Sequence, residues 1–351
     1  MAEKVSKTIF YTIIFLLPVN LGYHFIIREA YIGGLLIDYL IPVIYFQDIL
    51  VLIFLILNIG VLIRQIKNPN KYLVWFLFVI FLTSYFSVFR NAALVNFMRL
   101  FLYASFMLVV KYDYSDRIIY RNIVALLGWT VIFTSILAVL QWFKQGSIFD
   151  NYLVLGEQPY TAATPGINIE NFFGKAKVPP YATFKHPNIL GGILSVVLVW
   201  FLFYMDRIKI LKVSYIMGLL VLFMTLSKFS WISFIMGAVY YLVQKKAGKS
   251  IKYVVGGFVL SVTLVSLCLP FLNGIKALDS KPSFYRRADL LDSSYKLIKL
   301  KPLFGTGYST STAYIDEYLP TSRDIRFAQP PHSMFVLLFL ESGAFALLFF
   351  S

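Results

Sequence analysis

Cationic side chains in two parts of the chain could bind a negatively charged group. Arg286 and Arg287 lie at the start of an amphipathic segment, and Lys228 lies in a very short connection between two long apolar runs. A guanidinium binds phosphate oxygens through two parallel hydrogen bonds, and an ammonium binds them as a point charge. We therefore expect Arg287, Lys228 and Arg286 to be able to contact a phosphate group, although surface cations can also serve solubility alone.

Three further residues could move a proton or carry a buried charge. His332 lies just before the last apolar run, and a histidine side chain, with a reference pKa of about 6.5, can accept a proton from a sugar hydroxyl. Arg99 and Asp48 lie inside apolar runs, where ionisable residues are costly and often functional. Alternatively, the Arg99 side chain extends to the surface about two turns away.

Other kinds of site have no support in the residue pattern. His24, His186 and His332 are far apart in sequence, and Cys268 is the single cysteine, so no zinc cluster is visible. The chain has no Gly-x-x-x-x-Gly-Lys-Ser/Thr loop for a nucleotide and no Asp-x-Asp pair that would bring Mg²⁺ to a nucleotide sugar. We expect neither a cofactor nor a metal ion.

The composition indicates that lipid surrounds most of these residues. Of 351 residues, 59% are hydrophobic and 14% are charged, against about 25% charged in soluble domains. About 20 apolar residues cross a bilayer as a helix, because backbone groups in hydrocarbon must pair within the segment. The sequence predicts an all-α polytopic membrane protein with about ten such helices. The runs start near Thr8, Tyr39, Tyr72, Ala93, Asn122, Asn188, Val213, Phe229, Tyr253 and Ser333.

The basic residues predict the orientation of the helices. The net charge of +15 is concentrated in every second short connection, which is the positive-inside pattern with a cytoplasmic N-terminus and argues against nucleic acid as the partner. Two long connections, Lys144–Pro187 and Asn273–His332, then lie outside. The basic connections are Lys4–Lys7, Arg64–Lys71, Lys111–Arg121, Arg207–Lys212 and Lys245–Lys252.

The two long connections differ in character. Lys144–Pro187 is rich in turn-forming residues and has too few apolar residues for a core of its own. The second connection contains a helical pattern from Arg287 to Lys299, which Pro302 should end. No internal repeat is visible, so we expect residues 1–351 to form one membrane domain.

Several short motifs occur in a definite order. His332-Ser333 is followed by nine residues and Gly343, and Glu341-Ser-Gly is part of that segment. Arg287 stands fifteen positions before the turn Pro302-Leu-Phe-Gly-Thr-Gly. Two further motifs lie upstream, Phe184-Lys-His-Pro-Asn188 and Thr225-Leu-Ser-Lys228.

This order resembles the O-antigen ligase and polymerase family over residues 187–343, including the outer loop 273–332. The resemblance implies a GT-C-like architecture in the bacterial cytoplasmic membrane. It also implies a metal-independent inverting glycosyltransferase, with undecaprenyl-pyrophosphate-linked glycan as donor. The acceptor would be a sugar on another lipid-linked repeat unit or on a lipid A core. In this interpretation His332 and Arg287 are catalytic, and Lys228, Arg286 and Arg99 bind phosphate, whereas Glu341 is structural.

The chain departs from the family pattern at three places. Lys228 stands where the family usually has arginine, and Ala346 where ligases prefer Gly, Thr or Tyr. Family members usually continue for two more spans beyond the position of Ser351, so we expect a naturally short protein or a shortened gene. The sequence does not decide between a polymerase and a ligase. The alanine at position 346 departs from the ligase pattern and so slightly favours a polymerase. A flippase for lipid-linked sugars and a non-catalytic assembly partner remain as alternatives.

Overall fold

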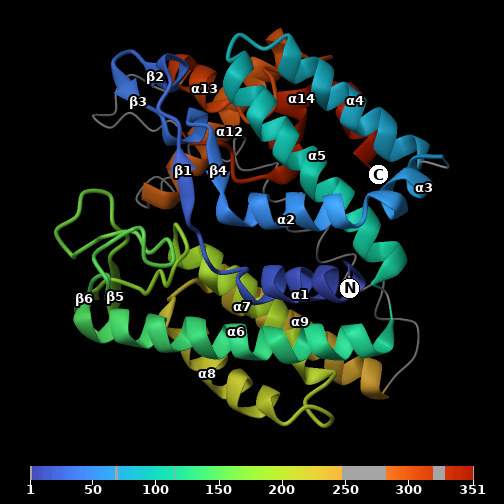
Figure 1. The fold of residues 1–351 in the computed structure, drawn as a ribbon. Helices are drawn as coiled ribbons and strands as arrows, with labels where there is room; N and C mark the ends of the chain where they lie inside the picture. Colours follow the sequence, from blue (N-terminus) through green and yellow to red (C-terminus); the bar gives the residue numbers. More distant parts are fainter. Residues whose placement is uncertain (1, 68–69, 115, 247–281, 319–328, 351) are drawn as a thin grey trace. The chain divides into compact units, whose positions relative to one another are not determined.

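A computed structural model describes residues 2–67, 70–114, 116–246, 282–318 and 329–350 of this mostly helical protein (Figure 1). The chain divides into two compact units, each built from separate stretches of sequence. Unit 1 comprises Met1–Gly22, Tyr45–Val61 and Phe106–Val255, and unit 2 comprises Tyr23–Ile44, Leu62–Ser105 and Gly256–Ser351. Two of the boundaries fall inside helices, α3 (Ile59–Lys67) and α5 (Arg90–Asp113).

Unit 1 is a helical bundle in which α7 packs against α8 and α9, and α6 packs against α1 and α8 (Figure 1). Glycine allows the close approach of two of these helices, because a Cβ atom on Gly191 would lie 2.6 Å from the Ser230 hydroxyl. The helices are α1 (Ala2–Phe15), α2 (Phe46–Leu57), α6 (Arg117–Lys144), α7 (Pro187–Leu202), α8 (Ile210–Met224) and α9 (Lys228–Lys246).

An aromatic cluster holds three segments of unit 1 together. The ring centroid of Phe10 lies 4.6 Å from that of Tyr114, and the ring centroid of Phe54 lies 5.2 Å from that of Phe106. Beside the rings, the Ser6 and Tyr114 hydroxyls are 2.6 Å apart. Three apolar segments that are distant in sequence therefore share one core.

The first long connection has more structure than its composition suggested. Strands β5 (Glu170–Phe172) and β6 (Lys175–Lys177) form a hairpin, and Tyr160, Val178 and Tyr181 make a small buried cluster. The expectation that this connection lacks a core of its own was wrong. Few apolar residues suffice because polar groups organise the rest of the loop, as described below.

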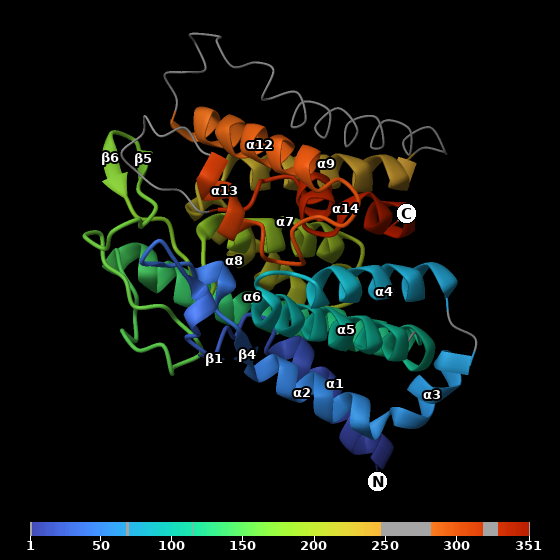
Figure 2. The ribbon, with the colours of Figure 1, turned by 90° about the horizontal axis from the view of Figure 1, so that it is seen from above.

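Unit 2 contains the C-terminal helices and the segment that follows β1 (Gly22–His24). Helix α4 (Lys71–Tyr85) packs against α14 (Met334–Phe350), which also packs against α12 (Pro282–Leu300). The short helix α13 (Thr312–Tyr318) packs against α12. Figure 2 shows α4 beside the first half of α5.

Short elements precede the second apolar helix. They are η1 (Arg28–Ala30), β2 (Tyr31–Ile32), β3 (Leu35–Leu36), η2 (Asp38–Leu40) and β4 (Val43–Tyr45), with β2 paired to β3 and β1 paired to β4. The second helix begins at Phe46, so the start predicted near Tyr39 was wrong. Pro42 explains the difference, since a residue before proline is kept extended and Ile41 has φ −76° and ψ 117°.

Only some of the described helices are long enough to cross a membrane. Among the described residues, α5 and the stretch Ile118–Lys144 of α6 are long and apolar enough to cross a bilayer, and α2 with α3, bent by 74°, would make a third span. Shorter apolar helices are α4, α7, α8 and α14. These features are consistent with a helical membrane protein. The run predicted from Tyr253 and the residue Cys268 lie outside the described part of the chain.

Candidate functional site

The predicted amphipathic helix in the second long connection is confirmed as α12. Leu291 and Ile298 are buried, and Tyr295 packs against the same cluster. On the opposite face, Lys296 and Asp292 form an ion pair of 2.7 Å. The helix begins at Pro282, about one turn before Arg287, and ends just before Pro302, as predicted.

Arg287 and His332 both belong to unit 2. Arg287 lies in the second turn of α12 and is half-buried, next to the fully buried Ala288. His332 is exposed and lies two residues before α14 begins. One hydrophobic cluster joins α12 to α14 through residues that include Leu291 and Val336. The helix that carries Arg287 is therefore packed against the helix that follows His332.

The glycine turn after α12 is docked on a kink in α14. Gly343 has φ +71° inside that helix, and a Cβ atom there would lie 2.0 Å from the Leu303 carbonyl oxygen. Gly305 also has a positive φ, +67°, and a Cβ atom on it would lie 2.5 Å from the Glu341 carbonyl carbon. Both motifs therefore require glycine because backbone meets backbone at this contact.

Hydrogen bonds complete the contact between the turn and α14. The N–H groups of Thr306 and Gly307 donate to the carbonyl oxygens of Leu340 and Glu341, each at 2.9 Å. The Glu341 carboxylate accepts 2.8 Å hydrogen bonds from the Ser309 N–H and the Ser311 hydroxyl. The structural role expected for Glu341 agrees with this geometry.

Arg99 is held by backbone within unit 2. Its guanidinium donates to the Val43 carbonyl oxygen. The neighbouring Tyr308, in the loop after the glycine turn, has its pKa raised by burial and by the Glu341 charge, and the Arg99 charge opposes this shift. Arg99 thus adjoins the segment that follows the glycine turn.

Asp48 has a local structural role. Its carboxylate accepts a 2.9 Å hydrogen bond from the Tyr45 N–H at the start of α2, so it caps that helix. A carboxylate is also favourable there, because the N-terminus of a helix carries partial positive charge.

Lys228 belongs to unit 1, where it is the exposed first residue of α9. The turn before it is rigid: Leu226 adopts φ +54°, and the Ser230 hydroxyl donates to the Ser227 hydroxyl at 2.8 Å. Buried Thr225 closes α8 by donating to the Leu222 carbonyl oxygen at 2.7 Å. The side chain of Arg286 lies outside the described residues, although its backbone is part of α12.

A buried polar network that the sequence reasoning missed organises the first long connection in unit 1. The carboxylate of Glu157, fully buried, accepts hydrogen bonds from the Gln141 side chain at 2.5 Å and from the N–H groups of Ile148 and Phe149 at 2.8 and 2.7 Å. Gln141 also accepts from the Ala182 N–H at 2.7 Å. The sequence feature that could have indicated this network is Gln141, a polar residue in the last turn of a long apolar helix.

Metal ligation has no support in the described part of the chain, where no three His, Cys, Asp or Glu side chains are grouped closely enough to hold an ion. Lys228 in unit 1 and Arg287 in unit 2 are among the cations that can contact an anionic group. Residues of these types can stabilise negative charge and, in the case of histidine, accept a proton.

Comparison with known proteins identifies the C-terminal part of the chain. No curated protein and no solved structure matches the chain. Residues 213–351 match the family described as O-antigen ligase (Wzy_C), and this segment contains Lys228, the glycine turn, Glu341 and His332. Residues 213–351 therefore match an O-antigen ligase domain, and this match supports the resemblance of the chain to the O-antigen ligase and polymerase family.

Proposed function

We propose that this protein transfers a glycan from undecaprenyl pyrophosphate to a sugar hydroxyl at the outer face of the cytoplasmic membrane. The observation that carries the proposal is the family match over residues 213–351, because this segment includes all of α12, the glycine turn and His332. The acceptor is another lipid-linked repeat unit in a polymerase or a lipid A core in a ligase. The Ala346 departure favours the polymerase.

The reaction is a single displacement that needs no metal ion. The acceptor oxygen forms a bond to the anomeric carbon while the bond from that carbon to the pyrophosphate oxygen breaks, so the anomeric configuration inverts. The acceptor hydroxyl proton passes to His332 as general base. The bonding electron pair leaves with the lipid pyrophosphate, whose growing charge Arg287 and Lys228 stabilise, with help from Arg286 and Arg99.

The flippase alternative loses its main support. It requires charged residues along a path through the membrane, and Arg99 and Asp48 were the two candidates. Both make backbone contacts inside their own unit, Arg99 with the Val43 carbonyl and Asp48 with the Tyr45 N–H. Because the Asp48 carboxylate caps α2, it is a weaker candidate for a transport path.

Complementation tests the enzymatic proposal. A polymerase-null or ligase-null strain with the matching repeat unit would express the wild type, His332→Ala, Arg287→Ala and, as a control on the exposed face of α12, Lys299→Ala. We expect a polysaccharide ladder or transferred glycan on a gel for the wild type and the control, and none for the two site variants at equal membrane abundance. Full activity of His332→Ala would exclude the general-base role. A well-expressed wild type that is inactive in every matched strain would favour the non-catalytic assembly partner.

A further inference from the structure

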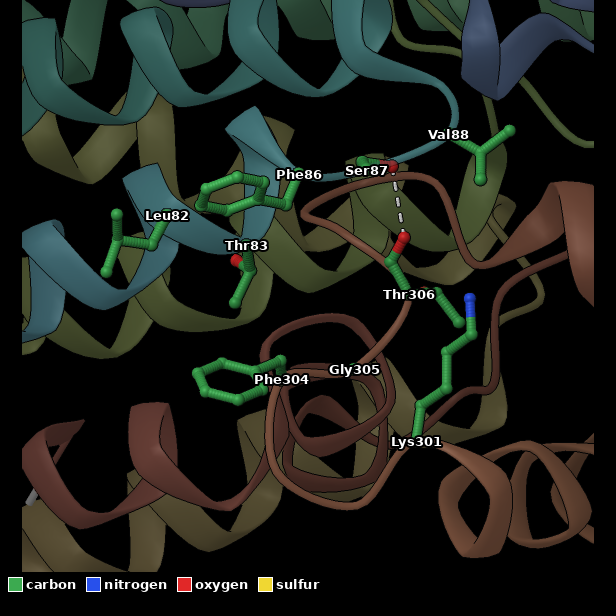
Figure 3. A pocket seen from close by; sticks show the side chains of 9 residues that line it. All are labelled: Leu82, Thr83, Phe86, Ser87, Val88, Lys301, Phe304, Gly305 and Thr306. Carbon is green, nitrogen blue, oxygen red and sulfur yellow. Dashed lines mark hydrogen bonds between the residues drawn. The ribbon is translucent and has the colours of Figure 1, made fainter.

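A cavity of about 430 Å³ lies within unit 2 beside the glycine turn (Figure 3). This volume is in the range of ligand pockets, roughly 300–1,000 Å³. The residues that carry the argument are Leu82, Phe86, Ser87, Lys301, Phe304 and Thr306, all of which line it. None of the residues with proposed roles in glycosyl transfer is among its lining residues.

The cavity joins two connections that the charge pattern predicts on the outer side. Ser87 lies between α4 and α5, and Thr306 lies in the glycine turn of the second long connection. The Ser87 hydroxyl donates to the Thr306 carbonyl oxygen at 3.0 Å, across more than two hundred residues of sequence. The cavity therefore lies at one end of α4, where hydrocarbon would give way to lipid headgroups under that topology.

Apolar side chains gather on one side of the lining, and the other side carries the Lys301 ammonium together with Val88. Figure 3 shows Leu82, Phe86 and Phe304 on one side and the Lys301 ammonium on the other, with Ser87 and Thr306 between them. Phe86 is 78% exposed and Phe304 is 57% exposed, which is costly in water but favourable in contact with hydrocarbon. This division matches an amphiphile with an anionic head.

The charge of the cavity lining indicates which anionic lipid headgroup would bind there. Lys301 is the one charged residue among the described residues that line the cavity, and its ammonium is held 4.6 Å from the ring centroid of Tyr314. A single positive charge balances the single negative charge of a phosphodiester, whereas a pyrophosphate diester carries two negative charges. The match therefore favours a phosphodiester.

The hydroxyl groups of the lining add a preference for a headgroup that donates hydrogen bonds. The Ser87 hydroxyl hydrogen is used on the Thr306 carbonyl, and the Thr83 hydroxyl donates to the Ile80 carbonyl at 3.0 Å. The Ser87 oxygen also accepts the Phe89 N–H at 3.3 Å, so one lone pair remains on this oxygen, whereas the Thr83 oxygen keeps its lone pairs. A glycerol headgroup supplies the complementary O–H donors.

The position along α12 separates this cavity from the proposed transfer site. Lys301 follows Arg287 by fourteen positions, and at 1.5 Å per residue this is about 20 Å along the helix. One phosphate group cannot contact both side chains over that distance. A lipid whose phosphate contacts Lys301 would therefore not contact Arg287 through the same phosphate.

We propose that this cavity binds an anionic phospholipid of the outer leaflet, with its phosphodiester against Lys301 and its acyl chain on Phe86 and Phe304. The lipid seals the contact between the α4–α5 connection and the glycine turn. This site is independent of the transfer reaction, so its test does not depend on activity.

The test measures lipid retention by the full-length protein. The protein is reconstituted in nanodiscs of equal parts phosphatidylglycerol and phosphatidylcholine, released into neutral detergent, and its bound lipids are counted by native mass spectrometry. The variants are Lys301→Gln, Lys301→Arg and Phe86→Ala, with Lys299→Gln as the matched loss of one charge two residues away. Thermal unfolding in neutral detergent without added lipid shows whether each variant is folded.

We expect the wild type, Lys301→Arg and Lys299→Gln to retain phosphatidylglycerol preferentially. The preference should fall about fivefold in Lys301→Gln, the effect of one lysine on an anionic lipid headgroup. Phe86→Ala should lower retention of phosphatidylglycerol while leaving the Lys301 charge in place. An unchanged preference in folded Lys301→Gln would overturn the proposal. Displacement of phosphatidylglycerol by an equimolar polyisoprenyl pyrophosphate would also overturn it, because the cavity would then be a donor site.

Discussion

Ser311 and Glu341, thirty residues apart in sequence, are joined by a 2.8 Å hydrogen bond from the serine hydroxyl to the glutamate carboxylate. The second carboxylate oxygen accepts the Ser309 N–H at the same distance. This pair explains why two short motifs, the glycine turn and the Glu-x-Gly segment, occur together. The glutamate of the second motif accepts the hydrogen bonds of the loop that follows the first. The loop that follows α12 is therefore held to α14, the helix that follows His332.

Removing the Glu341 carboxylate should loosen this contact. Glu341→Ala leaves the Ser309 N–H and the Ser311 hydroxyl without their acceptor, at a cost of about 1–3 kcal/mol for each buried group. Glu341→Gln keeps one acceptor oxygen and should cost less. The measurement is the thermal unfolding midpoint in detergent. Ser342→Ala is the control, since the Ser342 hydroxyl has no hydrogen-bond partner among the described residues. Equal midpoints for Glu341→Ala and the control would contradict the role of Glu341.

Gly343 should tolerate no side chain. Gly343→Ala would place a Cβ atom 2.0 Å from the Leu303 carbonyl oxygen at a positive φ, so we expect a loss of about 3 kcal/mol or more in unfolding free energy. Gly192→Ala in α7 is the matched substitution, because a Cβ atom there meets nothing within 4 Å. That variant should gain about 0.5–1 kcal/mol in helix stability. The unfolding free energies of both variants are measured by denaturant or heat titration. Similar values for the two variants would refute the close contact between Gly343 and Leu303.

Gln141 should control the order of the first long connection. Gln141→Leu has a similar size but leaves the Tyr181 and Ala182 N–H groups without their acceptor and removes one of the three donors to the Glu157 carboxylate. We expect faster cleavage between residues 145 and 185 in limited proteolysis, followed by mass spectrometry of the fragments. Gln244→Leu, on an exposed part of α9, is the control and should leave the cleavage rate unchanged. Unaltered protection in Gln141→Leu would show that the network does not hold the loop.

His186 should make unit 1 sensitive to acid. Its Nδ1 accepts the Asn188 N–H at 3.1 Å and caps α7, and burial lowers its pKa below the ordinary 6.5 while the Glu170 charge opposes this shift. The unfolded chain therefore takes up a proton first as the pH falls below about 6.5, and the folded state loses stability down to its own lower pKa. His186→Asn keeps a capping acceptor without titrating.

The measurement for His186 is the unfolding midpoint at about pH 7.5 and about pH 5.5, on either side of the ordinary histidine pKa. The wild type should lose more stability between the two values than His186→Asn does. An identical loss in both proteins would assign the acid sensitivity to other groups.

Lys228 offers a test of the phosphate role within the proposed function. Lys228→Arg restores the side chain that the family usually has at this position and supplies a bidentate donor, so activity should be equal or higher. Lys228→Gln removes the charge and should lower the transfer rate about tenfold or more, because it removes charge stabilisation from the leaving group. Complementation followed by quantified gel densitometry, at matched membrane abundance, measures both. Wild-type activity of Lys228→Gln would remove this residue from the site.

The sequence by itself determined several local elements and indicated the family that residues 213–351 match. The helix from Arg287 to Lys299 was predicted from the helical spacing of Leu291 and Ile298, and its end was predicted from Pro302. Both effects depend only on residues that are close in sequence, and the structure confirms both. The order of the glycine and histidine motifs indicated the family, because a motif is defined by residue types and their spacing in sequence.

The tertiary structure decided the contacts between distant residues. Docking of the glycine turn on Gly343, the Gln141–Glu157 network and the cavity at Lys301 each depend on segments whose separation in sequence says nothing about their distance in space. Local propensity also failed at Tyr39, where extended backbone around Pro42 and a packed segment took the place of a helix start. Long-range packing and buried hydrogen bonds are cooperative, so they appear only once the helices are assembled.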